Sequence, residues 1–164
     1  QQSLQLLGLW HSFKMAIYST NPNANRNYHI EEKFEAGAVL LGSEVKSIKD
    51  GKLSIKESYA IIRKGEIFIL NSYIPKYNNS SYFTHEETRD RKLLLNKVEI
   101  RKLIGKIKIK GYTLIPIKVY SKKNLIKFEL GLGKGKKLYD KRADLKNKDL
   151  KRELGKAFKN KTSI

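Results

Sequence analysis

Alternation between apolar and polar residues is the main pattern in the first half of the chain. From Asn27 to Leu41 this alternation predicts one long strand. It breaks near Glu31-Glu32-Lys33, where an irregularity such as a bulge is expected. The apolar positions that define the strand are Tyr28, Ile30, Phe34, Ala36, Ala38 and Leu40.

Two pairs of shorter alternating runs predict β-hairpins. The runs 59–63 and 66–70 flank Lys64-Gly65, a pair of residues typical of a two-residue hairpin turn. The runs 112–120 and 125–132 are joined by four polar residues and predict a second hairpin. With the long strand, these runs indicate five or six mostly antiparallel strands.

Helical spacing occurs twice. A short helix is predicted to begin at Gly42-Ser43, with Ser43 as its N-cap, and to end at Gly51. Apolar residues every three or four positions predict a second helix from Leu93 to Lys110, and the polar segment 73–91 before it is expected to be a long loop. The predicted fold class is mainly β. It is a small closed antiparallel β-barrel of oligonucleotide-binding type with two or three flanking helices and a basic C-terminal tail.

The two ends of the chain differ from this pattern. The only methionine is Met15, and the apolar segment 4–10 before it lacks the flanking basic residue and cleavage site of a secretory signal. Turn-forming residues follow Met15, and a run rich in lysine closes the chain. The predicted division is 1–14 as a non-native extension, 15–26 as a flexible N-terminal lead, 27–138 as the β-barrel RNA-binding domain and 139–164 as the basic tail.

The excess of basic residues limits the classes of binding partner that are expected. The 164 residues hold 35 Lys and Arg against 16 Asp and Glu, a formal net charge of +19. So basic a chain attracts polyanions, of which RNA and DNA are the commonest in a cell. A membrane surface and a ribosomal protein are the other interpretations of this charge. The chain has no cysteine, which removes disulfides and thiolate metal sites and is compatible with a cytoplasmic location.

The stretch from Gly131 to Arg142 combines glycines, cations and one aromatic ring. Its glycines at alternate positions could let backbone amides approach a phosphate, while Tyr139 could stack on a base. The alternative is a glycine-rich strand end that runs into a solvated basic linker. From Lys134 to Lys161 there are 12 Lys or Arg and 4 Asp or Glu, with a thin apolar stripe. We therefore expect this tail to be disordered when free and helical on a polyanionic partner.

Candidates for enzymatic chemistry are few. Glu31, Glu32 and Glu35 could act as acid–base carboxylates or as the metal ligands of a nuclease, but ordinary surface charge is the preferred interpretation. The three histidines share no metal-ligand spacing. Neither an enzyme nor a cofactor is expected. Basic residues instead gather in and around the predicted elements, and they favour nucleic-acid contact: Lys46, Lys49, Lys52, Arg89, Arg91, Lys92, Lys122, Lys123 and Lys127.

Several short blocks occur in the order found in one known family. They are Phe34-Glu-Ala-Gly37, Gly42-Ser-Glu-Val-Lys-Ser47, Gly51-Lys52, Asp90-Arg-Lys-Leu-Leu-Leu-Asn96, Leu103-Ile-Gly105, Gly131-x-x-Lys-Gly-Lys-Lys137 and Asp140-Lys-Arg142. With these blocks, the chain from about residue 25 to 159 resembles the SsrA-binding proteins, also called small protein B. That family is the partner of transfer-messenger RNA in bacterial ribosome rescue.

The resemblance implies a function, partners and site residues. The family binds the tRNA-like domain of transfer-messenger RNA and delivers it, with elongation factor Tu, to stalled ribosomes. It has no enzymatic activity, and a cytoplasmic monomer with no membrane partner is expected. A ribosomal or general RNA-binding barrel protein is the alternative function.

By motif position, the RNA-contacting candidates are Glu35, Leu94 and Lys127, to which the charge pattern adds Lys46, Arg91 and Lys92. In some relatives a histidine stands at the position of Tyr139, which keeps the stacking ring. The candidates for the ribosomal decoding centre are Lys134, Lys136, Lys137, Tyr139, Asp140, Lys141 and Arg142.

Overall fold

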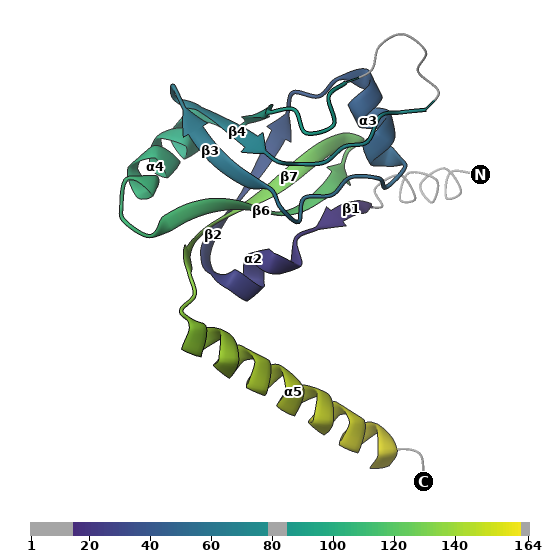
Figure 1. Cartoon of the computed structure of the whole chain (residues 1–164), viewed down its shortest axis with the longest axis vertical. Coiled ribbons are helices and arrows are strands. Elements are labelled where there is room, and N and C mark those ends of the chain that lie inside the picture. Colours follow the sequence, from purple (N-terminus) through teal and green to yellow (C-terminus); the bar gives the residue numbers. More distant parts are fainter. Residues whose placement is uncertain (1–14, 79–84, 162–164) are drawn as a thin grey trace, which may run out of the picture.

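The computed structural model describes residues 15–78 and 85–161, and an antiparallel sheet dominates it (Figure 1). The predicted non-native extension 1–14 lies outside the described residues. The sheet order is β1-β6-β3-β4-β5-β2-β7, and β6 also pairs with β7, which links six strands in a ring of pairings. The strands are β1 (Ile17–Thr20), β2 (Tyr28–Ala38), β3 (Tyr59–Arg63), β4 (Glu66–Leu70), β5 (Arg91–Leu94), β6 (Tyr112–Lys122) and β7 (Leu125–Gly135).

Helices flank this sheet on several sides. Figure 1 shows α3 and α4 at opposite ends of the strands, α2 beside β2, and α5 extending away from the rest. Among the described residues, no helix has both the length and the apolar character needed to span a membrane. The helices are α2 (Pro22–Asn27), α3 (Gly42–Lys49), α4 (Lys97–Ile107) and α5 (Leu138–Lys161).

The predicted long strand and both hairpins are confirmed. In β2 the register to β7 shifts between Ile30 and Glu32, where the alternation breaks. The β3–β4 turn places Lys64 at φ 51° and Gly65 at φ 73°, a left-handed pair that matches the twist of a two-residue hairpin. The β6–β7 turn does the same with Lys123 at φ 48° and Asn124 at φ 62°.

The helix predicted from Leu93 is wrong at its start. Residues Arg91–Leu94 form strand β5, and Leu93 pairs with Ala38 of β2 and Ile67 of β4. Leu93 is 1% exposed, so pairing within the sheet outweighs the helical spacing that begins at this residue. Helix α4 begins four residues later, and Glu99 accepts a hydrogen bond from the Asn96 backbone amide at its start.

Two further predictions are corrected near the N-terminus. The lead predicted as flexible over 15–26 contains β1, which pairs with β6, and helix α2. Asn21 explains this order: its backbone amide donates to the Ile117 carbonyl and its side-chain amide to the Pro116 carbonyl. The N-cap of α3 is Leu41 rather than Ser43, because the helix already begins at Gly42, and the Ser43 hydroxyl is hydrogen-bonded to His85.

The apolar residues form two clusters. The larger one fills the interior of the sheet, where α3 contributes Ile48 and α4 contributes Leu103, both fully buried. The smaller one joins Ala24 of α2 to Ile115 and Ile117 of β6. Helix α2 is thereby packed firmly on the outside of the sheet.

Candidate nucleic-acid interface

Leu94 and Lys127 line the same surface hollow. It has a volume of about 350 Å³ and lies where β2 and β5 end, beside α3 and the β6–β7 turn. Leu94 is 50% exposed and Leu125 60% exposed, so aliphatic surface is open to solvent next to a lysine. Such a surface offers apolar contact for a base and a cation for a phosphate.

Glu35 lies on β2 near this hollow and holds basic and aromatic neighbours in place. Its carboxylate accepts a hydrogen bond from the Tyr120 hydroxyl, and the Lys122 ammonium lies 3.1 and 3.2 Å from its two oxygens. The Tyr120 hydrogen bond chiefly lowers the pKa of Glu35, and the charges of Lys122 and Lys127 lower it further. The structure therefore brings Glu35, Leu94 and Lys127 together from three strands.

Tyr120, the tyrosine beside Glu35, is itself fixed by burial and by a neighbouring lysine. Tyr120 is 5% exposed, and burial together with the hydrogen bond to Glu35 raises the pKa of its hydroxyl. The Lys118 ammonium lies 5.3 Å from the centre of the Tyr120 ring and 4.0 Å from Glu129. The result is a fixed array of alternating charge on the outer face of β2, β6 and β7.

The assignment of Arg91 to RNA binding is wrong. Its side chain is fully buried and pairs with Glu44, whose carboxylate is also buried. The guanidinium also donates to the Ser72 hydroxyl and backbone carbonyl, both at 2.9 Å. Because every part of the group is enclosed by protein, Arg91 stabilises the fold and has no surface for a phosphate.

Lys92 and Lys46 are exposed but have partners within the protein. The Lys92 ammonium is 2.6 Å from Glu66 on β4, and the Lys46 ammonium is 5.6 Å from the centre of the Tyr77 ring. Lys46 follows Val45, which lines the hollow. Both lysines keep enough accessible surface to attract a polyanion.

Packing explains two of the three glycines in the stretch from Gly131 to Arg142. A Cβ on Gly133 would lie 2.2 Å from the His29 carbonyl oxygen, and one on Gly131 would lie 2.8 Å from the Ile117 side chain. Both residues are buried and pair with β2 and β6. The alternative of a glycine-rich strand end is the better interpretation, because these backbones approach their neighbours in the sheet rather than a phosphate.

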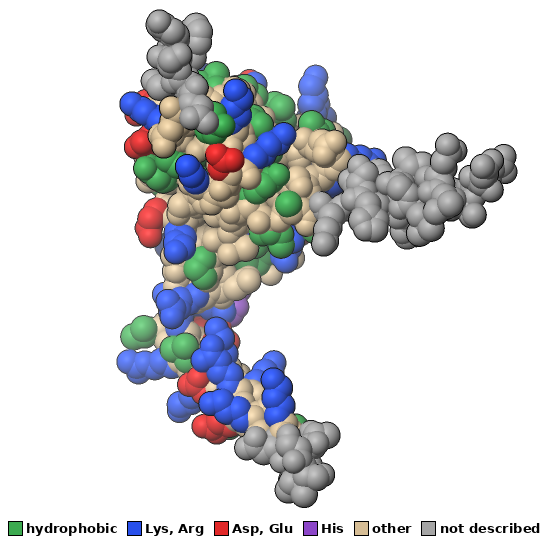
Figure 2. Space-filling view, turned by 90° about the vertical axis from the view of Figure 1, so that its right-hand side faces the viewer, with side chains coloured by type: hydrophobic (Ala, Val, Ile, Leu, Met, Phe, Trp, Pro, Cys, Tyr) green, Lys and Arg blue, Asp and Glu red, His purple; other side chains and the backbone are tan. Residues whose placement is uncertain are grey.

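The tail candidates divide into anchored and exposed residues. Lys134 lies 4.7 Å from the centre of the Tyr112 ring, and Lys136 pairs with Asp144. Tyr139 is 66% exposed and Arg142 is exposed on α5. Figure 2 shows Lys and Arg side chains gathered along the tail helix. The tail thus presents an accessible ring next to a dense positive surface.

The three carboxylates considered for catalysis do not converge. Glu31 accepts a hydrogen bond from the Tyr112 hydroxyl at 2.7 Å, Glu32 pairs with Lys102, and Glu35 binds Tyr120. In the part of the chain that the structure describes, no group of three or more His, Asp or Glu could hold a metal ion. The arrangement is that of three separate surface contacts.

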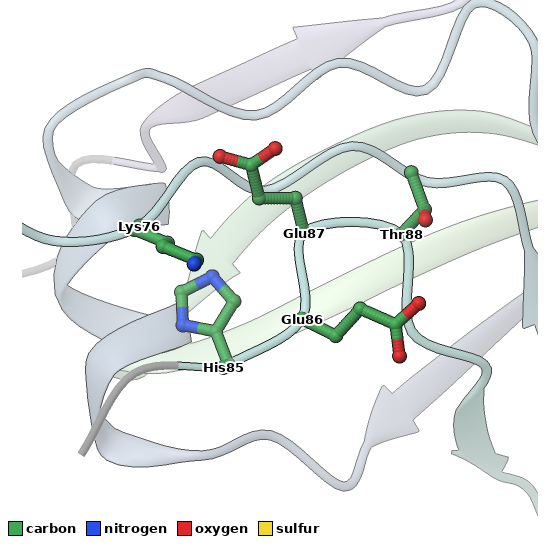
Figure 3. A pocket seen from close by; sticks show the side chains of 5 residues that line it. All are labelled: Lys76, His85, Glu86, Glu87 and Thr88. Atoms are coloured by element: carbon green, nitrogen blue, oxygen red, sulfur yellow. The ribbon is translucent and has the colours of Figure 1, made fainter.

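A second hollow, of about 490 Å³, contains His85 (Figure 3). His85 is 3% exposed, and its Nε2 lies 2.8 Å from the Ile74 carbonyl, so Nε2 carries the proton and donates it. Its Nδ1 lies 2.8 Å from the Ser43 hydroxyl. The carboxylates of Glu86 and Glu87 point away from each other in Figure 3. Both ring nitrogens are used within the protein, so His85 serves the fold.

Sequence reasoning counted Lys122 among the cations, but it missed the pairing roles of Tyr120 and Lys122 at the interface and of Glu44 in the interior. The Tyr120 hydroxyl and the Lys122 ammonium fix Glu35, and Glu44 neutralises Arg91. A signal for Tyr120 was present, since it ends the predicted strand 112–120, whereas Lys122 fell in the segment predicted as the hairpin connection. The Glu44–Arg91 pair has no such signal, because the two residues lie 47 positions apart.

Comparisons with known proteins agree on one family. The family model described as "SmpB protein" matches residues 18–160. The SsrA-binding protein of Geobacter sulfurreducens is 51% identical over 146 residues, covering 89% of this chain and 95% of the relative. The SsrA-binding protein of Bacillus subtilis is 50% identical over 143 residues, covering 87% and 92%.

One solved structure is similar over most of the fold. It is described as "tmRNA-SmpB: a journey to the center of the bacterial ribosome". It is 43% identical in sequence to this chain and superimposes with a TM-score of 0.60. The match covers 73% of this chain and 84% of the solved chain.

Proposed function

The chain belongs to the SmpB protein family, and on that premise we propose that it binds the tRNA-like domain of transfer-messenger RNA and delivers it to stalled ribosomes for trans-translation. The observation that carries the proposal is the surface where Glu35, Leu94 and Lys127 meet. A folded RNA elbow presents phosphates and unstacked bases, and this surface offers a cation, an aliphatic side chain and a fixed carboxylate.

Glu35 supports a shape-specific contact rather than charge attraction alone. A carboxylate facing RNA is repelled by phosphates, so it weakens binding unless it accepts a base N–H or orders a cation. Its contact with Lys122 at 3.1 Å supports the second role. The array then holds Lys122 and Lys127 at fixed spacing for the RNA backbone.

The tail is assigned to the ribosome. We infer that the segment from Lys137 to Arg142 enters the decoding centre and that the rest of α5 follows the empty mRNA channel. Exposed Tyr139 would stack on a base of ribosomal RNA, a contact that contributes about 1–3 kcal/mol.

Several finer features complete the proposal. The ring of strand pairings supports a closed barrel of oligonucleotide-binding type. The protein acts as a cytoplasmic monomer together with elongation factor Tu, and its task is binding rather than catalysis.

The experiment is a gel shift that compares the tRNA-like domain with an ordinary tRNA at fixed salt. The proposal expects tighter binding of the tRNA-like domain. A ribosomal or general RNA-binding protein would bind the two alike, and that result would contradict the proposal.

Two variants assign the binding to this surface. Lys127→Ala should weaken binding and lower the salt slope by about 0.7–0.9 for each phosphate that the lysine neutralises. Lys110→Ala is the charge-matched control. Lys110 lies just before β6, at the end of the β6–β7 hairpin that is opposite to the turn at Asn124 and to the proposed surface. Glu35→Ala should also weaken binding, although it removes a negative charge. Tighter binding of Glu35→Ala at low salt would remove Glu35 from the interface.

A further inference from the structure

Glu35 occupies a position in the sheet where a carboxylate is costly. In the register of β2 and β7 it lies directly opposite Glu129, and like charges that face each other destabilise an antiparallel pair. The Glu35 side chain is 36% exposed, so RNA can reach it from solvent. Hydrogen-bond donors and cations around the two carboxylates must therefore offset their repulsion.

Tyr120 donates to Glu35 from a fixed place on β6. Its register partners are Lys127 on β7 and Ile17 on β1, so a neighbouring strand pairs with it on each side. A buried tyrosine hydroxyl needs a hydrogen-bond partner, and here that partner is the Glu35 carboxylate. Because the ring is enclosed by the sheet, its hydroxyl holds this carboxylate in one orientation.

Lys122 is the exposed end of this chain of contacts. Its ammonium lies 3.1 and 3.2 Å from the two oxygens of Glu35, and its side chain is 53% exposed. A lysine side chain in water samples many rotamers, and contact with a fixed carboxylate reduces their number. Glu129 has a cation of its own, because Lys118 lies 4.0 Å from it. The contacts therefore lead from a buried ring through Glu35 to a cation that RNA phosphates can reach.

We propose that Tyr120 is a positioning residue for RNA recognition: its hydroxyl holds the Glu35 carboxylate, and through it the Lys122 ammonium, in one arrangement at the candidate RNA surface. This inference rests on the proposed function, because it concerns the surface that would bind the tRNA-like domain. Side chains already arranged in the free protein lose less freedom on binding, so more of the contact energy appears as affinity. Tyr120 is buried and offers RNA almost no surface, so its contribution passes through Glu35.

The first test measures the pKa of Glu35 in the free, full-length protein by NMR. The charged and titratable groups that face Glu35 from neighbouring strands are Tyr120 and Lys122 of β6 and Lys127 and Glu129 of β7. The Tyr120 hydrogen bond is the main cause of the lowered pKa, so Tyr120→Phe should raise the pKa of Glu35 toward its ordinary value of 4.5. An unchanged pKa in Tyr120→Phe would overturn the inference.

The second test measures affinity for the tRNA-like domain by gel shift. Tyr120→Phe keeps the buried ring and leaves Glu35 open to water, so the variant should fold, which thermal denaturation checks. It should bind about three- to tenfold more weakly than the parent. In a Glu35→Ala background the same substitution should change the affinity by less than about twofold, because its effect passes through Glu35. Equal losses in the two backgrounds would show that Tyr120 acts independently of Glu35 and would overturn the positioning role.

Tyr112→Phe is the matched control. The Tyr112 hydroxyl donates to Glu31 at 2.7 Å, which repeats the tyrosine–glutamate pair between β6 and β2 at the other end of the β6–β7 hairpin. This control should leave both the pKa of Glu35 and the RNA affinity unchanged. A loss of affinity as large as that of Tyr120→Phe would show a general effect of removing a hydroxyl and would contradict the inference.

Failure of this inference differs from failure of the proposed function. If the parent prefers the tRNA-like domain to an ordinary tRNA and Tyr120→Phe binds equally well, the positioning role is wrong and the proposed function stands. If the parent binds the two RNAs alike, the proposed function is contradicted, and the RNA role of Tyr120 is contradicted with it.

Discussion

At the scale of single residues, basic side chains have opposite uses in this protein. Arg91 is fully buried against Glu44, whereas Lys127 lines an open hollow. Burial of the Glu44 carboxylate alone would raise its pKa. Hydrogen bonds from Arg91 and Arg89 outweigh that effect and leave the pKa of Glu44 below its ordinary value of 4.5. The pair is therefore charged in the folded protein and depends on both partners.

Removing one partner of this pair should destabilise the fold. We expect Arg91→Met to lower the free energy of unfolding by about 3–5 kcal/mol, because it leaves a buried carboxylate without its partner. Urea denaturation followed by circular dichroism measures the change. The control is Lys92→Met, which breaks the exposed pair with Glu66 and should cost less than about 1 kcal/mol. Equal losses would contradict the assignment of Arg91 to the fold.

The lowered pKa of Glu44 also predicts how stability depends on pH. A carboxyl group with a lower pKa in the folded state stabilises that state fully above its unfolded pKa, and this contribution is lost as pH falls through the folded pKa. The parent should therefore lose stability below about pH 4.5 more steeply than Glu44→Gln, which cannot titrate at this position. Urea denaturation between pH 7 and 3 measures both slopes. The same slope in the two proteins would mean that Glu44 contributes no pH dependence.

At the scale of elements, β7 approaches β2 closely at Gly133. Gly133 lies opposite Ile30, where the register of β2 shifts. Its missing side chain lets the His29 carbonyl come within 2.2 Å of the position that a Cβ would occupy. The irregularity in β2 and the glycine in β7 therefore act together to let the two backbones pack closely.

A methyl group at Gly133 should disrupt this packing. We expect Gly133→Ala to cost about 1–3 kcal/mol or more of unfolding free energy, because the atom it meets is backbone and cannot move aside. Gly135→Ala is the matched control, since a Cβ there meets no atom of the described residues within 4 Å. Thermal denaturation distinguishes the two variants. Loss of RNA affinity in Gly133→Ala with unchanged stability would instead support a phosphate contact at this glycine.

At the scale of the whole molecule, the candidate RNA surface and the tail lie in different places. The candidate RNA surface lies on the sheet, near the β6–β7 turn at one end of the hairpin. The tail leaves from the opposite end of the hairpin, after Gly135. Binding of the tRNA-like domain and contact with the ribosome can therefore occur at the same time.

Truncation should separate the two tasks. We expect a chain that ends at Lys137 to bind the tRNA-like domain nearly as well as the full chain, since the Glu35–Lys127 surface remains. The same chain should fail to support alanyl transfer on ribosomes stalled without a codon. The measurement is peptidyl transfer by both proteins at matched RNA occupancy. Equal yields of peptidyl transfer would show that the tail is only a solvated basic segment with no role in this reaction.

Local patterns in the sequence were enough to predict the hairpins, the bulged long strand and the basic tail. Each depends on residues close together in the chain, such as Lys64-Gly65 at the β3–β4 turn. The resemblance also identified Glu35, Leu94 and Lys127, and the structure brings these three together. The sequence therefore determined most of the fold and the main candidate site.

Only the tertiary structure decided which cations are free to meet RNA. Arg91 and Lys136 look like other basic residues in the sequence, but each binds a partner far away in the chain. Arg91 donates to Glu44, 47 positions away, and Lys136 donates to the Asn25 carbonyl, 111 positions away. The early strand β1 likewise forms because β6, about a hundred residues later, supplies its partner. Burial and pairing of this kind depend on chain segments that meet only after folding, and no local pattern of residues records them.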